Sequence, residues 1–130
     1  MPGGGLVVND AYNANPTSMR AALLDVRERA GSGRAVAVLG GMAELGDDSA
    51  VYHRRTAELA RELDIEVLAV GELAREYDAD RWVGDVESAL AALTELVRPG
   101  DVVLVKASRA VGLEGIASAL TNPHAAWSAS

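Results

Sequence analysis

Four short runs of apolar, mostly β-branched residues recur along the chain, and longer amphipathic segments separate them. The runs cover residues 6–8, 35–39, 65–70 and 102–105. They show no regular polar alternation, which is typical of strands covered on both faces of a parallel sheet. This pattern constrains the fold strongly, because neighbouring parallel strands need long crossover connections.

The segments between these runs have helical periodicity and recognisable helix-end signals. Helices are predicted at about residues 16–29, 48–63, 86–97 and 113–120, with a shorter one at 72–77 and a weak strand at 81–83. Crossovers between parallel strands are almost always right-handed, so this order of elements favours helices on both faces of one sheet. We therefore expect an α/β fold, a Rossmann-like three-layer sandwich with a mostly parallel sheet.

The length of 130 residues suits a single domain with one core. We predict a domain over residues 1–120 and a loosely ordered tail over 121–130. No apolar run approaches the ~18 residues that would span a membrane, and no charged segment leads into an apolar signal core. We therefore expect a cytoplasmic protein without membrane insertion. Since cysteine is absent and only two histidines are present, we expect no disulfide and no structural metal site.

The formal net charge is −7, which argues against binding to nucleic acid because phosphate backbones are met by a basic surface. Any anionic ligand must be met by a local group of cations. Lys106 is the only lysine in the chain and follows the last apolar run. In open α/β sheets ligands bind beyond the carboxyl ends of the strands, so the residues after each run are the candidates for function.

The segment after the first run combines helix-start signals with side chains suited to a ligand. Asn15 and Pro16 are explained locally, as the N-cap and first position of a helix. Asp10, Tyr12 and Asn13 are not, because a carboxylate, a phenol and an amide on an irregular loop suit a ribose and a base. A ligand site and a plain turn both remain open for these three residues.

The segment after the second run is rich in glycine. Gly40 and Gly41 allow a sharp turn of the backbone, and Asp47 and Asp48 complement the dipole of the following helix. His53 lies within that helix and is interpreted as a helix-face residue rather than a catalyst.

The segment after the last run contains Lys106, Ser108 and Arg109. One interpretation is a strand end with a solvated basic pair. The other is a cationic site for a phosphate or a carboxylate at the end of the sheet.

These three segments resemble motifs of the Mur ligase family, in its C-terminal domain. Residues 10–19 are similar to the family's Asp-x-Tyr-Asn-Ala-Asn-Pro-x-Ser-Met, in the form found in the branch that adds D-alanyl-D-alanine. Residues 39–46 resemble Leu-Gly-Asp-Met-x-Glu-Leu-Gly, and residues 105–109 resemble Val-Lys-Gly-Ser-Arg. The chain departs from these motifs at Gly41, where aspartate is usual, and at Ala107, where glycine is usual.

The resemblance implies an ATP-dependent ligase that joins a carboxylate to an amine through an acyl phosphate. The implied reaction adds D-alanyl-D-alanine to UDP-N-acetylmuramoyl-tripeptide during peptidoglycan synthesis. The phosphate-binding Gly-x-x-x-x-Gly-Lys-Ser/Thr loop is not in this sequence. Catalytic residues are therefore expected on a central ATP-binding domain, and an N-terminal domain is expected to hold the UDP-sugar. The chain alone is expected to be inactive and to bind neither ATP nor Mg²⁺ tightly.

The resemblance also implies roles for individual residues. Asp10 is expected to contact the ribose of ATP, while Tyr12, Asn13 and Asn15 line the nucleotide and hinge side. The residues expected to face the phosphate or D-alanyl-D-alanine are Lys106, Ser108 and Arg109. Two alternatives remain open at this point. One is a related ligase such as a folylpolyglutamate synthase, and the other is a stand-alone α/β binding module.

Overall fold

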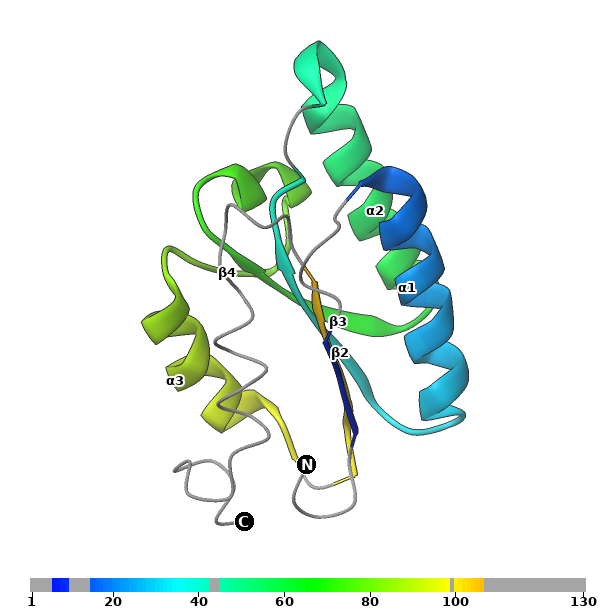
Figure 1. Cartoon of the computed structure of the whole chain (residues 1–130). Helices are drawn as coiled ribbons and strands as arrows, with labels where there is room; N and C mark the ends of the chain where they lie inside the picture. The colour runs from blue at the N-terminus through cyan, green and yellow to red at the C-terminus, as the bar shows by residue number, and fades with distance from the viewer. Residues whose placement is uncertain (1–5, 10–14, 43–44, 99, 107–130) are drawn as a thin grey trace.

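The computed structural model describes residues 6–9, 15–42, 45–98 and 100–106. In the described residues, strands and α-helices follow one another in the order that the sequence predicts, with two 3₁₀-helices (η) between them (Figure 1). They are β1 (Leu6–Asn9), α1 (Pro16–Ala30), β2 (Ala35–Gly40), η2 (Gly46–Asp48), α2 (Ser49–Glu62), β3 (Ile65–Val70), η3 (Leu73–Tyr77), β4 (Arg81–Val83), α3 (Val86–Leu96) and β5 (Val102–Lys106).

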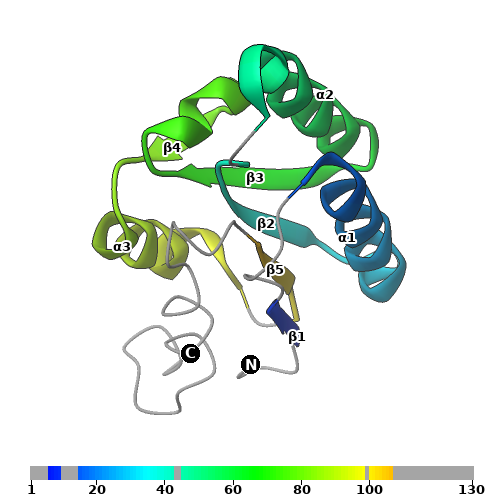
Figure 2. The same ribbon diagram turned by 45° about the horizontal axis from the view of Figure 1, so that its top comes forward.

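Within the described ranges, five strands form one sheet in the order β1-β5-β2-β3-β4, and every pair of neighbours is parallel. The last strand, β5, therefore lies between the first two. Helices α1 and α2 cover one face of the sheet and α3 covers the other (Figure 2). This arrangement confirms the predicted three-layer sandwich.

The core has two layers, one on each face of the sheet. Alternate residues of β2 point to opposite layers: Ala37 and Leu39 pack with the α1 and α2 side, whereas Val36 and Val38 pack with α3. All of β2 is buried, and so is all of β5. Burial on both faces explains why these strands are continuous apolar runs rather than alternating ones.

Helix α1 begins and ends at the predicted signals. Asn15 is the N-cap, and its side chain accepts a hydrogen bond from the Ser18 backbone N–H at 2.9 Å. The Ser18 hydroxyl in turn accepts from the Asn15 backbone N–H at 3.0 Å, which completes a capping box. At the other end Gly31 has φ of 57°, a conformation that glycine adopts readily, and its N–H bonds to the last turn.

Two predicted helices differ from the structure in detail. The helix predicted at residues 48–63 begins one residue later, because Asp48 belongs to the preceding 3₁₀ turn and caps α2 without a side-chain hydrogen bond. The short helix predicted at 72–77 is the 3₁₀-helix η3, which ends at Asp78 with a left-handed φ of 53°. The predicted helix at 113–120 and the tail at 121–130 lie outside the described residues. In the part that is described, no helix is long and apolar enough to cross a membrane.

Candidate functional site at the carboxyl edge of the sheet

The last residues of the parallel strands lie along one edge of the sheet, which we call the carboxyl edge. Insertion of β5 between β1 and β2 decides which strand ends are neighbours. Asn9 of β1 pairs with Val105 of β5, and Lys106 of β5 pairs with Leu39 of β2. The three segments that the sequence singles out therefore leave the sheet from adjacent strands, about 5 Å apart.

Lys106 is the last residue of β5, and on this edge it lies between the ends of β1 and β2. Its side chain is fully buried. That finding excludes the solvated basic pair as a description of Lys106, because a solvated ammonium would be exposed. The other two motifs begin at the ends of these neighbouring strands, β1 and β2.

Asn15 lies at the start of α1 and confirms the local interpretation of its segment. Both its side-chain oxygen and its backbone N–H are engaged with Ser18 in the capping box. Its expected contact with a nucleotide stays a prediction.

Five of the predicted site residues lie outside the described residues. Asp10, Tyr12 and Asn13 follow β1 in the sequence, and Ser108 and Arg109 follow β5. The two strands that lead into these segments are hydrogen-bonded neighbours.

The glycine loop, which we define as residues 40–42, comprises the last residue of β2 and the two residues after it, and is buried throughout. His53 of α2 holds this loop. Its Nε2 accepts a hydrogen bond from the Met42 backbone N–H at 2.8 Å, and its ring is fully buried. His53 does lie on a face of its helix, but on the face that packs inward. Sequence periodicity places His53 in the helix without revealing that its partner is Met42, just beyond the end of β2.

Tyr77 of η3 forms a hydrogen bond to Gly40, the first residue of the glycine loop. Its hydroxyl donates to the Gly40 carbonyl at 2.8 Å, and its ring meets the His53 ring edge-on with centroids 4.7 Å apart. Burial raises the pKa of the Tyr77 phenol well above its usual value, because the phenolate would lose its hydration. The phenol therefore stays protonated and serves as a donor to the loop.

Gly41 is in close contact with η3. A Cβ built on Gly41 would lie 2.5 Å from Cγ and 2.6 Å from Cβ of Leu73, which is closer than carbon atoms approach in proteins. The aspartate that is usual in the resembling motif cannot occupy this position unless η3 moves. The departure from the motif is thus coupled to the packing of Leu73.

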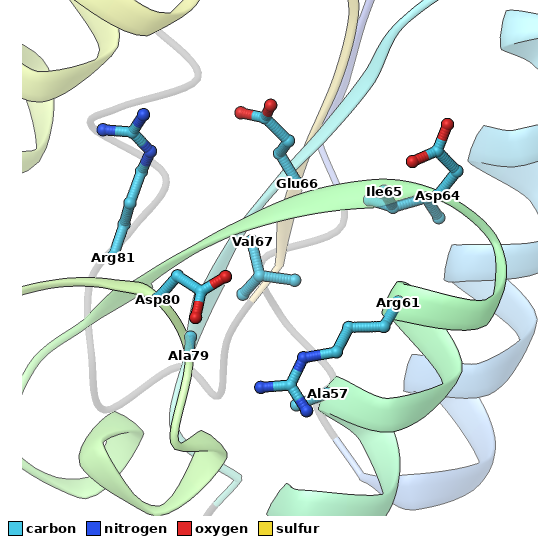
Figure 3. A pocket seen from close by; sticks show the side chains of 9 residues that line it. All are labelled: Ala57, Arg61, Asp64, Ile65, Glu66, Val67, Ala79, Asp80 and Arg81. Atoms are coloured by element: carbon cyan, nitrogen blue, oxygen red, sulfur yellow. The ribbon is translucent and has the colours of Figure 1, made fainter.

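A hollow of about 460 Å³ lies near the opposite end of the sheet, beside the first residues of β3, and Figure 3 shows the side chains that line it. Val67 points into it, and Arg61 and Asp80 lie on opposite sides. The hollow exists because β4 pairs with β3 only from Leu68 onward, which leaves the first residues of β3 without a neighbouring strand on that side. None of the three sequence motifs lines it, so we place the candidate site at the carboxyl edge instead.

Known proteins are similar to this chain in sequence and in structure. Residues 2–109 match the family described as Mur ligase, glutamate ligase domain. The chain belongs to this family. A UDP-N-acetylmuramoyl-tripeptide--D-alanyl-D-alanine ligase from Mycobacterium tuberculosis is 42% identical over 90% of this chain. The match covers 29% of that ligase, so this Mur ligase chain spans less than a third of the length of such relatives.

Two solved structures resemble this Mur ligase domain closely. The MurF ligase of Thermotoga maritima, in complex with ADP, superposes with a TM-score of 0.78 at 32% identity, covering 91% of this chain and 28% of that one. The UDP-N-acetylmuramoylalanyl-D-glutamyl-2,6-diaminopimelate--D-alanyl-D-alanyl ligase of Acinetobacter baumannii gives a TM-score of 0.73 at 31% identity, covering 89% and 26%. The family resemblance of the three motifs is therefore confirmed by the whole domain.

Proposed function

We propose that this chain is the C-terminal domain of a cytoplasmic, ATP-dependent ligase that adds D-alanyl-D-alanine to UDP-N-acetylmuramoyl-tripeptide. The observation that carries the proposal is the 42% identity, over 90% of the chain, with a ligase of that name. The structural likeness to a MurF ligase in complex with ADP supports a role next to the nucleotide.

In this proposal the rest of the ligase supplies the phosphate-binding loop and the catalytic residues. The chain has no Gly-x-x-x-x-Gly-Lys-Ser/Thr sequence. Among the residues that the structure describes, no three His, Asp or Glu side chains come together as metal ligands. By resemblance to the family, we assign Mg²⁺ to the central domain and the UDP-sugar to an N-terminal domain, with this domain closing over ATP and D-alanyl-D-alanine.

The proposed contacts lie along the carboxyl edge. Asp10 holds the hydroxyls of the ribose, and Tyr12, Asn13 and Asn15 line the nucleotide and hinge side. Adjacency of β1 and β5 supports a shared site, because it makes the first and third motifs start from neighbouring strands.

The cationic group completes the proposed site. Lys106, Ser108 and Arg109 face the phosphates or the dipeptide. A chain with a net charge of −7 needs such a local cluster to meet an anion.

The first test concerns the isolated chain. We expect weak ATP binding and no hydrolysis, since one side of a nucleotide pocket without a phosphate loop gives little affinity. Isothermal titration calorimetry and ADP release measure both properties. A Kd tighter than about 10 μM, which corresponds to roughly 7 kcal/mol, or steady ADP release would overturn this division of roles.

The second test uses the full-length ligase and the variant Asp10→Ala. Loss of a charged hydrogen-bond acceptor weakens binding by about 1.5–3 kcal/mol, so kcat/KM for ATP should fall about tenfold to a hundredfold. The thermal midpoint should stay unchanged. Asp85→Ala is the control, because loss of the N-cap of α3, on the other face of the sheet, should lower the thermal midpoint and leave kcat/KM unchanged. Kinetics of Asp10→Ala within twofold of the unmodified ligase would remove Asp10 from the site.

A further inference from the structure

The second sequence motif, residues 39–46, has no role in the proposed function, although it begins at the carboxyl edge. The glycine loop continues β2 directly beyond Leu39, which pairs with Lys106. Tyr77 and His53 engage the Gly40 carbonyl and the Met42 N–H, so the loop offers neither of these groups to a ligand. Any effect of this loop on a substrate must therefore act through the position of the strand ends beside it.

The loop is held by α2 and η3 at three consecutive residues. Tyr77 donates to the Gly40 carbonyl, Leu73 packs against Gly41, and His53 accepts from the Met42 N–H. Of these, His53 is the contact that joins the loop to α2.

The hydrogen bonds of His53 require one particular tautomer of its neutral imidazole ring. Because the Met42 N–H donates to Nε2, the proton of the neutral imidazole lies on Nδ1. Nδ1 lies 2.7 Å from the Ser49 carbonyl, to which it donates. The Ser49 hydroxyl donates to Glu76 of η3 at 2.7 Å, and this carboxylate lies 3.6 Å from Nδ1. Nδ1 of His53 therefore bonds to its own helix, and Nε2 bonds to the glycine loop.

We propose that His53 is a positioning residue for substrate binding, which sets the end of β2 beside Lys106 through its bond to Met42. This inference rests on the proposed function, in which Lys106 faces the phosphate or the dipeptide. His53 touches no substrate in this scheme. It keeps the loop backbone in one place, and β2 in turn supports the neighbouring end of β5.

Two substitutions separate the two bonds of His53. In His53→Gln the side-chain oxygen lies near the position of Nε2 and still accepts from Met42. In His53→Asn the amide lies near the position of Nδ1, so it keeps the bond to Ser49 and loses the bond to Met42. Both variants remove the ring and its contact with Tyr77, which makes them controls for each other. Arg54→Gln, an exposed neighbour on the same helix, is the control for general effects.

The first measurement is hydrogen exchange of the Met42 amide by NMR in the 130-residue chain. We expect His53→Asn to accelerate exchange at Met42 about tenfold or more, with His53→Gln and Arg54→Gln near the unmodified rate. Equal acceleration in the Gln and Asn variants would overturn the proposed bond. This measurement does not depend on any enzymatic activity.

The second measurement is steady-state kinetics of the full-length ligase, with Lys106→Met as reference. His53→Asn should raise KM about fivefold to tenfold for the substrate whose KM Lys106→Met also raises, with kcat largely kept. His53→Gln should restore that KM. A KM effect on the other substrate alone, or none, would overturn the positioning role. Failure of the unmodified ligase to add D-alanyl-D-alanine would instead contradict the proposed function.

Discussion

The hydroxyl of Tyr77 donates to the backbone carbonyl of Gly40 across 2.8 Å, and the Tyr77 side chain is fully buried. Tyr77→Phe keeps the ring but leaves this carbonyl without its donor. We expect a loss of about 1–3 kcal/mol in the free energy of unfolding at neutral pH, measured by urea denaturation. Tyr52→Phe, on a partly buried ring of α2, is the matched control. Equal stability of Tyr77→Phe and the unmodified chain would show that the bond is not formed.

The raised pKa of Tyr77 predicts a loss of stability in alkali. In the unfolded chain the phenol ionises near pH 10, whereas burial keeps it protonated in the folded chain. The contribution of Tyr77 is therefore fully present below about pH 10 and declines as pH rises above it. Denaturation between neutral pH and about pH 11 should show a steeper decline in the unmodified chain than in Tyr77→Phe. Parallel declines would contradict the effect of burial.

Close packing of Gly41 against Leu73 predicts coupled substitutions. Gly41→Ala places a methyl group 2.5 Å from Leu73 Cγ, so we expect a destabilisation of about 1–3 kcal/mol by overpacking. Leu73→Gly removes the atoms that collide and should make the same substitution at Gly41 nearly neutral. A double-mutant cycle in urea measures this coupling. Additive effects of the two substitutions would show that the loop adjusts freely.

Arg27 joins the end of α1 to the turn between α2 and β3. Its Nη1 donates to the Leu63 carbonyl at 3.1 Å, and its Nη2 donates to the Gly31 carbonyl at 2.9 Å. A lysine ammonium cannot span both turns, so Arg27→Lys should cost about 1–2 kcal/mol in thermal or urea unfolding. The control is Arg29→Lys, because Arg29 forms an exposed ion pair with Asp25 and should change little. Similar losses in both variants would assign the effect to charge or helix propensity instead.

Asp85 is the N-cap of α3, and its lowered pKa predicts a loss of stability in acid. The Ser88 backbone N–H donates to its carboxylate at 2.7 Å, and hydrogen bonds from Ser88 hold the pKa of Asp85 below its usual value. A lowered pKa stabilises the fold above about pH 4, and this contribution disappears as pH falls through the folded-state pKa. Asp85→Asn keeps a good N-cap without the titration. Its denaturation midpoint should match the unmodified chain near pH 7 and fall less between about pH 4 and pH 2. A steeper fall in Asp85→Asn would contradict the assignment.

Local patterns in the sequence determined the positions of the strands and α-helices in the described residues. The bounds of β3 follow directly from its apolar run, and α1 begins where Asn15 and Pro16 indicate. These boundaries can be predicted from sequence because apolar runs, helix caps and the restricted backbone of proline involve residues only a few positions apart.

Tertiary structure alone decided which of these elements meet. Insertion of β5 between β1 and β2 places Lys106 beside the glycine loop, and this order depends on pairing between strands far apart in the chain. The inward direction of His53 and its bond to Met42 likewise require α2 to be docked on the sheet. Periodicity identifies the face of a helix but not the partner of one side chain, because that partner is fixed by long-range packing that no local pattern encodes.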